Sequence, residues 1–407
     1  MVSEYQRKVK KNKAKIGVLT FSFTKDNYGQ VLQYLATQEY LGRKGLEATL
    51  VEPKGWSVSF KQRCKNKLRE ILYRIKNRII KPKRSAVSIS VQPQIEKKEE
   101  VKKELGIEEK KAEVFNRWTE ITERKETEQP RMFEEFKKKY FSRQAGTYNE
   151  ILGSGYKAYC IGSDQTWSCA GWHMMLGWVP PKYKRFTIAP SIGHRHYSDE
   201  EVNSFRNELC KFDFITVRED NGLELCHRCG YEGAVKVLDP TFLLPSSAYE
   251  PFVDVQQETQ KPYVFIYLLG ADIEVSIDEM VKFCKSQGYD VKYVESQGRD
   301  ENVESIPATV GQWLGLIKNA SYVLTNSFHG MAFSIIYHKP FVVFPIIGLM
   351  KDMNSRILNL AASLNLMDRI YNGNLNVLHN SIDWNVTERV INENRKILDH
   401  KIENLNL

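Results

Sequence analysis

The sequence predicts an α/β protein with two doubly wound, Rossmann-like domains that face a cleft. Short apolar runs alternate with helical patterns along most of the chain, a rhythm typical of parallel sheets. The length of 407 residues is too great for one ordinary core. A polar, turn-rich stretch near residues 245–260 interrupts the alternation. We therefore expect an N-terminal domain at 1–250 and a C-terminal domain at 251–407.

The first domain begins with a strand, a helix and a second strand. "KIGVLTF" (15–21) and "EATLVEP" (47–53) are apolar runs between polar residues, and the apolar positions in 29–45 recur near helical spacing and end at Gly45. This order predicts the start of a parallel sheet. The alternation returns later with "KAYCIG", "RFTIAPSIG", "FDFITVRE" and "AVKVLDP".

Residues 55–128 interrupt this pattern, and we interpret them as a charged insertion that is helical or partly disordered. Residues 57–84 contain eleven Lys or Arg and one Glu, with apolar residues at helical spacing. Such a basic amphipathic helix can lie on an anionic membrane surface, here through residues 61–84. The alternative, which we favour, is a solvated helix packed on its own domain.

The second domain shows a fresh alternation. "YVFIYLLG" (263–270), "YDVKYVE" (289–295), "YVLTN" and "FVVFP" are its predicted strands, and a helical tail is expected at the C-terminus. The motif "SFHG" (327–330) follows one of these strands and opens the next helical pattern. The joint between a strand and a helix is where doubly wound sheets bind ligands.

Composition excludes several functional classes. No run of eighteen apolar residues and no signal peptide pattern is present. The seven cysteines are unpatterned, and Cys226 and Cys229 lack the second ligand pair that a structural zinc needs. We interpret them as helix-packing thiols and expect a cytoplasmic protein without a metal site. The net charge of +9 comes with no nucleic-acid motif, so we expect no nucleic-acid partner.

Polar residues gather at four predicted strand ends. Taken singly, each cluster has a structural explanation, such as a turn, a helix cap or a local ion pair. Four clusters at strand ends favour a shared cleft, because the carboxyl ends of parallel strands lie at one edge of a sheet. The predicted cleft residues in the first three clusters are Asn27, Tyr28, Gln30, Ser163, Asp164, Gln165 and Glu219, with Arg218 beside Glu219.

The fourth cluster, "TNSFHG", predicts an anion site. Free N–H groups at the start of the following helix would face a ligand and favour phosphate. Gly330 would leave room for the ligand, and His329 would stand beside it as a proton donor. Arg218 offers a forked donor for a carboxylate or phosphate.

Competing motifs lack the required context. "GSGYKA" (153–158) fits a dinucleotide fingerprint but precedes its strand. No phosphate-binding GxxxxGK[ST] loop and no GxSxG nucleophile elbow occurs.

As a set, the strand-end motifs resemble the polysaccharide pyruvyl transferase family. The resemblance covers most of residues 14–370, and it is carried by "NYGQVLQYLATQEYLGRKG", "YCIGSDQTW", "FDFITVRED", "VLDPTFLL", "TNSFHGMAFSIIYHKPF" and "NSRILNLAASLNLMDR". "GSDQTW" and "NSFHG" are its most specific pieces.

The resemblance implies a GT-B-like fold with the active site between the domains. It also implies transfer of a pyruvyl (1-carboxyethylidene) group from phosphoenolpyruvate to a sugar of a bacterial surface polysaccharide or its lipid-linked precursor, which forms a ketal. Phosphoenolpyruvate is then a co-substrate, and no cofactor is expected. Carried over by position, His329 is the general acid and Arg218 grips the donor. The remaining donor-binding candidates are Asn326, Ser327, Phe328, Gly330 and Arg356.

One position departs from the family pattern. Characterised members often carry Arg-Leu-His where this sequence has Ser327, Phe328 and His329. Losing a charged contact should weaken anion binding by about 1–2 kcal/mol unless Arg356 or Lys351 compensates. Two alternatives therefore stay open: a GT-B-like glycosyltransferase that uses a nucleotide sugar, and a non-catalytic protein of polysaccharide assembly on the inner face of the membrane.

Overall fold

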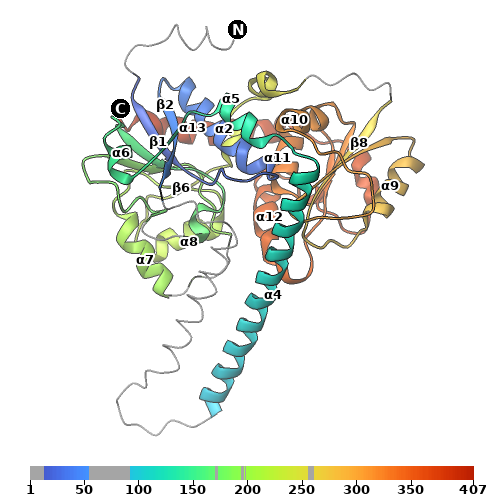
Figure 1. Ribbon diagram of the computed structural model, residues 1–407, viewed down its shortest axis with the longest axis horizontal. Coiled ribbons are helices and arrows are strands. Elements are labelled where there is room, and N and C mark those ends of the chain that lie inside the picture. Colours follow the sequence, from blue (N-terminus) through green and yellow to red (C-terminus); the bar gives the residue numbers. More distant parts are fainter. Residues whose placement is uncertain (1–12, 55–91, 170–172, 194–196, 198, 255–260) are drawn as a thin grey trace.

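The computed structural model describes residues 13–54, 92–169, 173–193, 197, 199–254 and 261–407. Parallel sheets flanked by helices form two parts that lie side by side (Figure 1). This arrangement confirms the predicted α/β class with two doubly wound units. The predicted basic helix at 57–84 lies outside the described residues.

The first part is built on a five-stranded parallel sheet. Its strand order is β3-β2-β1-β4-β5, and a parallel bridge between Phe186 and Phe214 places the pair β6-β7 beside β5. The chain runs from β1 to β2 on one side and returns to β4 on the other. The strands are β1 (Lys15–Leu19), β2 (Glu47–Pro53), β3 (Arg143–Gly146), β4 (Ala158–Ile161), β5 (Lys184–Thr187), β6 (Thr216–Val217) and β7 (Val235–Lys236).

The second part has a four-stranded parallel sheet with the order β11-β10-β8-β9. Its central strands, β8 and β10, are fully or almost fully buried, as expected where helices cover both faces of a sheet. The strands are β8 (Tyr263–Leu269), β9 (Asp290–Ser296), β10 (Tyr322–Thr325) and β11 (Phe341–Val343).

Helices cover the sheets and connect their strands. Several begin at side chains that accept a hydrogen bond from the first turn, as at Asn27, Thr309 and Ser327. The helices are α2 (Tyr28–Arg43), α4 (Gln92–Glu128), α5 (Phe133–Tyr140), α6 (Tyr148–Leu152), α7 (Asp199–Leu209), α8 (Asp220–Arg228), α9 (Ile277–Ser286), α10 (Val310–Asn319), α11 (Phe328–Ile336), α12 (Asn354–Ser363) and α13 (Trp384–Glu403). None of the helices in the described part is long and apolar enough to cross a membrane.

Two elements have positions that the sequence did not predict. The edge strand β3 reads "RQAG" and is mostly exposed, so it carries no apolar run. Helix α4 projects far from the body and only its C-terminal end packs against it (Figure 1).

Cys226 and Cys229 are buried free thiols in and just after α8, consistent with a packing role.

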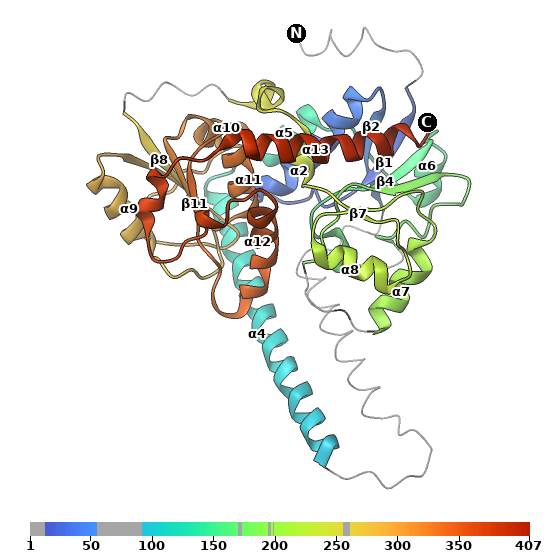
Figure 2. The same cartoon turned by 180° about the vertical axis from the view of Figure 1, so that it is seen from behind.

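The predicted C-terminal helical tail is α13, which crosses from the second part to the first (Figure 2). Asp399 accepts a hydrogen bond from Tyr40 and pairs with Lys44, both on or next to α2. Arg395 donates to the carbonyls of Phe242 and Leu244. The last helix therefore packs on the first part, although it follows the strands of the second part in sequence.

Candidate active site

The candidate site lies where both parts present the carboxyl ends of their central strands. In the first sheet the chain changes direction between β1 and β4, and in the second between β8 and β10. Ligands of open α/β sheets bind beyond such switch points. The loops after β1, β4 and β10 carry three of the four clusters that the sequence singled out.

The side chains of Asn326 and Ser327 and the glycine at position 330 shape the start of α11. Asn326 is buried and clamps the end of β8: its amide donates to the Leu269 carbonyl at 3.0 Å and its oxygen accepts from the Leu269 N–H at 2.7 Å. Ser327 caps the helix by accepting from the Gly330 N–H. A Cβ on Gly330 would lie 2.3 Å from Oγ1 of Thr325, so this glycine permits close packing within the fold. These contacts are internal to the fold, and the donor-binding roles expected for Asn326, Ser327 and Gly330 remain predictions.

His329 projects from the first turn of α11 toward the first part. Its ring is buried and packs against Gly29, where an added Cβ would lie 1.9 Å from Nδ1. Nε2 lies 3.6 Å from Oδ2 of Asp239, which is too far for a hydrogen bond. The imidazole therefore has a fixed place and a free nitrogen.

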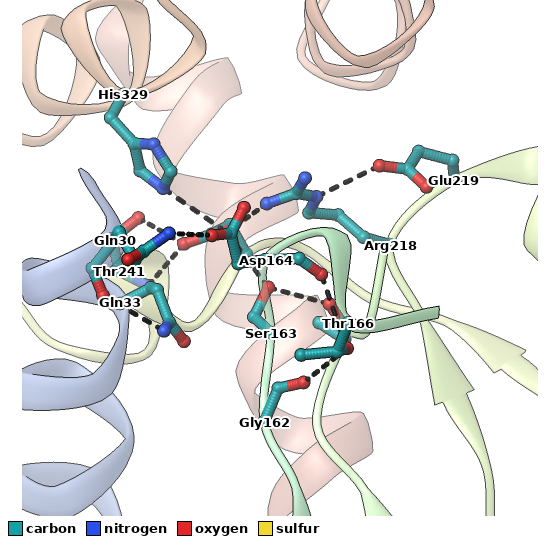
Figure 3. A network of polar contacts seen from close by, with 12 residues as sticks. Gln30, Gln33, Gly162, Ser163, Asp164, Thr166, Arg218, Glu219, Thr241 and His329 are labelled. Carbon is teal, nitrogen blue, oxygen red and sulfur yellow. Dashed lines mark hydrogen bonds and ion pairs between the residues drawn. The ribbon is translucent and has the colours of Figure 1, made fainter. Parts of the chain in front are cut away.

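Asp239 joins the predicted catalytic pair. Its Oδ2 accepts a hydrogen bond from Nη1 of Arg218 at 2.6 Å and faces Nε2 of His329. Figure 3 shows the side chains of His329, Arg218 and Asp164 pointing toward one another from α11, the end of β6 and the end of β4. The structure thus brings together the histidine and the arginine that the sequence separates by more than a hundred residues.

Arg218 is held on several sides. Its Nε donates to Glu219 at 3.1 Å, and its guanidinium lies over the Phe328 ring, 4.6 Å from the centroid. Burial alone would lower the pKa of Arg218, but Glu219 and Asp239 raise it above the ordinary value. The guanidinium is therefore charged and fixed, and Glu219 orients it.

Asp164 and Gln30 meet across the loops after β4 and β1. Nε2 of Gln30 donates to Oδ2 of Asp164 at 3.0 Å, and Asn27 accepts from the Gln30 N–H as the cap of α2. Asp164 has a φ of +68°, a left-handed conformation that costs a non-glycine residue some free energy. This backbone turns the carboxylate toward Arg218.

The remaining predicted cleft residues have different places. Ser163 is buried and its hydroxyl lies 3.2 Å from Oδ2 of Asp239. Gln165 opens a short 3₁₀ helix and packs near Gly193. Tyr28 is a core residue: it is fully buried, stacks on Trp313 and donates to the Ala308 carbonyl at 2.6 Å. These contacts give Tyr28 a structural role, and the cleft role expected for it remains a prediction.

A cavity of about 120 Å³ opens beside Arg218. Its cationic lining groups are Arg218, Lys236 and Arg356, and Asp239 is the acidic one; the other lining residues are Val237, Leu238, Phe328, Asn359, Leu360, Ser363, Asn394 and Ile397. These residues come from the first part and from α11, α12 and α13. The cavity therefore lies at the contact between the two parts.

Arg356 is the added cation of this cavity. No ion pair of Arg356 occurs among the residues that the structure describes, and burial together with the neighbouring Arg218 lowers its pKa. Lys351, the other residue that the sequence offered as a compensating cation, is exposed. Of the two cations that the sequence offered, Arg356 is the one that lines the cavity.

Three of the buried side-chain nitrogens without a hydrogen-bond partner belong to this site. Within the described part of the chain, Nη2 of Arg218, Nε of Arg356 and Nε2 of His329 are buried without a hydrogen-bond partner. Leaving such groups unpaired is costly. An acidic ligand would satisfy them.

The described residues contain no group of three or more His, Cys, Asp or Glu side chains arranged to hold a metal ion.

Asp239 and Gly29 are the site residues that sequence reasoning missed. Asp239 stands in "VLDP" directly after a predicted strand, and a carboxylate at a strand end was a usable signal. Gly29 lies in "NYGQ", in the first turn of α2, and the sequence alone indicates only an ordinary turn glycine there.

Solved structures with a similar fold include two UDP-N-acetylglucosamine 2-epimerases and one glycosyltransferase. The epimerase from Neisseria meningitidis bound to UDP-GlcNAc has a TM-score of 0.42 at 12% identity, with 96% of this chain and 100% of that chain covered. The Rickettsia bellii epimerase has a TM-score of 0.42 at 10% identity, with 97% of this chain and 97% of that chain covered. The glycosyltransferase SsfS6 from Streptomyces sp. SF2575 has a TM-score of 0.40 at 11% identity, with 94% of this chain and 96% of that chain covered. Scores this low carry no information about substrate.

Curated proteins give no significant match. A family model, by contrast, matches residues 27–346, a range that contains the start of α2 from its cap Asn27, the "GSDQTW" and "SFHG" motifs and Asp239. The model is that of polysaccharide pyruvyl transferases. Since the match covers most of the chain and every strand-end cluster described above, the chain belongs to the polysaccharide pyruvyl transferase family.

Proposed function

We propose that the protein transfers a pyruvyl group from phosphoenolpyruvate to two hydroxyls of a saccharide and forms a cyclic ketal. The proposal is supported by unpartnered nitrogens of Arg218 and Arg356, which line the cavity, and of His329, which faces the same Asp239 oxygen as Arg218. Phosphoenolpyruvate bears a carboxylate and a phosphate, and each is a good acceptor for a guanidinium.

The roles follow from position. Arg218 and Arg356 hold the two acidic groups of the donor. His329 gives a proton to the methylene carbon, which becomes a methyl group, and positive charge develops at the neighbouring carbon. One acceptor hydroxyl adds to that carbon and loses its proton. The C–O bond to phosphate then breaks, phosphate leaves with the electron pair, and the second hydroxyl closes the ring with loss of its proton.

The setting of the reaction also belongs to this proposal. The acceptor is a sugar of a surface polysaccharide, free or lipid-linked, and the reaction takes place in the cytoplasm. Contact with the inner face of the membrane through residues 61–84 would bring the enzyme to a lipid-linked acceptor, and a net charge of +9 suits an anionic surface.

A thermal-shift titration tests the choice of donor. Phosphoenolpyruvate at about a hundred times its Kd should stabilise the native state by about 2.7 kcal/mol, because it binds the folded chain only. Uridine diphosphate should give no shift. Stabilisation by uridine diphosphate and not by phosphoenolpyruvate would favour the nucleotide-sugar glycosyltransferase, and no response to either would favour the non-catalytic alternative.

The role of His329 is tested by His329→Ala in a phosphate-release assay with phosphoenolpyruvate and a panel of saccharide acceptors. We expect acceptor-dependent release to fall by at least about a hundredfold, the usual contribution of a general acid. Circular dichroism should show an unchanged fold. Turnover equal to that of the wild type would remove His329 from the mechanism.

A further inference from the structure

Asp239 has a carboxylate whose two oxygens serve different parts of the molecule. Oδ1 accepts from the N–H of Thr241 at 3.0 Å and from its hydroxyl at 2.9 Å. Oδ2 accepts from Nη1 of Arg218, lies 3.2 Å from the Ser163 hydroxyl and faces His329. Oδ1 thus fixes the aspartate to its own loop, and Oδ2 is aimed at the pair of residues with proposed chemical roles.

Asp239 is ill placed to act on a substrate itself. Its side chain is completely buried, whereas the neighbouring Asp164 retains some exposure. Burial would raise the pKa of Asp239, but His329, Arg218 and the Thr241 N–H together hold it well below the ordinary value. A carboxylate this enclosed, with its oxygens engaged by neighbours, is a poor proton acceptor for an incoming hydroxyl.

The contacts of Asp239 connect the two parts of the molecule. Arg218 follows β6 of the first part and His329 belongs to α11 of the second. Without a negative charge between them, the guanidinium would lose its charge-assisted hydrogen bond and the imidazole its facing anion. Glu219 would still hold Nε of Arg218, so the expected change is a reorientation of the guanidinium within an intact fold.

We propose that Asp239 is a positioning residue that sets Arg218 and His329 at a fixed separation for the acidic donor. The proposal deepens the function proposed above and rests on it for the identity of the donor. Asp239 acts through its two neighbours, Arg218 and His329, whose side chains its carboxylate orients.

The variant Asp239→Asn distinguishes a positioning role of Asp239 from a purely electrostatic effect of its charge. Asparagine keeps the shape and an acceptor for Thr241, but it removes the negative charge and places an amide near Nη1 of Arg218. If Asp239 contributed only charge, its loss would make the cavity more positive and bind anions more tightly. If it positions Arg218, Asp239→Asn should weaken binding of phosphoenolpyruvate by about ten- to a hundredfold.

Thr241→Val is the matched control, since it removes one hydrogen bond to Oδ1 and leaves the charge and the Oδ2 side intact. It should lower the melting temperature without changing the affinity for phosphoenolpyruvate. Calorimetric titration of the full-length wild type and both variants with phosphoenolpyruvate measures the affinity, and thermal unfolding measures the melting temperature. Unchanged or tighter binding by Asp239→Asn, or equal weakening by both variants, would overturn the positioning role.

Two further readouts separate this proposal from the proposed function. Inorganic phosphate, titrated in parallel, tests the cavity as an anion site even if phosphoenolpyruvate is not the donor; binding of phosphate alone would reject the donor and leave the Asp239 comparison valid. A crystal structure of Asp239→Asn needs no ligand. We expect the Arg218 guanidinium to leave its place over Phe328, and an unmoved Arg218 and His329 would contradict the proposal.

Discussion

A single glycine, Gly29, gives the ring of His329 its place. The position where a Cβ would stand is only 1.9 Å from Nδ1 of the imidazole and 2.1 Å from Cγ. Real side-chain atoms do not approach so closely, so any other residue at position 29 must displace the ring. Because Gly29 lies in the first turn of α2 and His329 in the first turn of α11, this contact fixes the two helix starts against each other.

Gly29→Ala should therefore impair the site and spare most of the fold. We expect a loss of phosphate release of at least about tenfold, because a shift of the proton donor by an ångström is costly for catalysis. Gly42→Ala in the same helix is the control. Nothing lies within 4 Å of its added Cβ, and alanine should stabilise the helix by about 0.5–1 kcal/mol. Activity of Gly29→Ala at the level of Gly42→Ala would contradict the assigned contact.

At this scale the sequence predicts residues that stand in recognisable motifs. His329 and Arg218 follow strands in patterned segments, and the structure brings them to one carboxylate. Tyr28 belongs to the same kind of motif, yet its ring lies in the core. Which way a side chain points at a helix start depends on neighbours far along the chain, here Trp313 and Ala308, and no local pattern contains them.

At the scale of elements, helix α4 is fastened across the carboxyl ends of β8 and β9. A Cβ on Gly298 would lie 2.2 Å from Cα of Trp118, so the helix backbone packs directly on the loop after β9. Lys125 forms an ion pair with Glu295, whose side chain is only 4% exposed. Thr122 donates to Asp26, in the loop that leads to α2. The end of α4 thus ties the second sheet to the loop that leads into α2 and Gly29.

Lys125→Ala should loosen this attachment, because it leaves the buried Glu295 without its cation. We expect a loss of about 2 kcal/mol in the free energy of unfolding, below the range for a fully buried pair since Lys125 is partly exposed. Denaturant titration measures it. Arg124→Ala removes the neighbouring pair with Asp300, which is exposed, and should change stability little. Equal effects of the two substitutions would show that Glu295 does not depend on Lys125.

Elements with a buried apolar run are predictable, and those without one are not. β8 and β10 read "YVFIYLL" and "YVLT" and are found where the sequence predicts them. β3 has no such signal because it is an edge strand with polar side chains. The sequence also gives no indication that α4 packs through Trp118, because that residue packs against distant parts of the chain, among them Gly270, Gly298 and the cluster around Ile346.

At the scale of the whole molecule, the two parts are joined by elements that cross between them. α13 leaves the second part and reaches α2 of the first (Figure 2), where Tyr40 donates to Asp399. Residues of α12 and α13 also line the cavity beside Arg218. The predicted domain boundary near residues 245–260 remains a prediction, and residues 255–260 lie outside the described part. The position of α13 means that the cavity depends on how the C-terminal helix is seated.

Leu398→Ala tests that dependence. Leu398 is completely buried in α13, and its truncation should cost about 2–4 kcal/mol in the free energy of unfolding. We also expect weaker binding of phosphoenolpyruvate, since a loosened α13 shifts the cavity wall that carries Asn394. Lys396→Ala, at an exposed position of the same helix, is the control and should change neither quantity. Full stability of Leu398→Ala would contradict the packing described for α13.

A crystal structure of the wild-type protein with phosphoenolpyruvate tests the central claim most directly. We predict that the carboxylate and the phosphate of the ligand accept hydrogen bonds from Nη2 of Arg218 and Nε of Arg356, with Nε2 of His329 within reach of the methylene carbon. A ligand bound elsewhere, with these three nitrogens still unpartnered, would contradict the account.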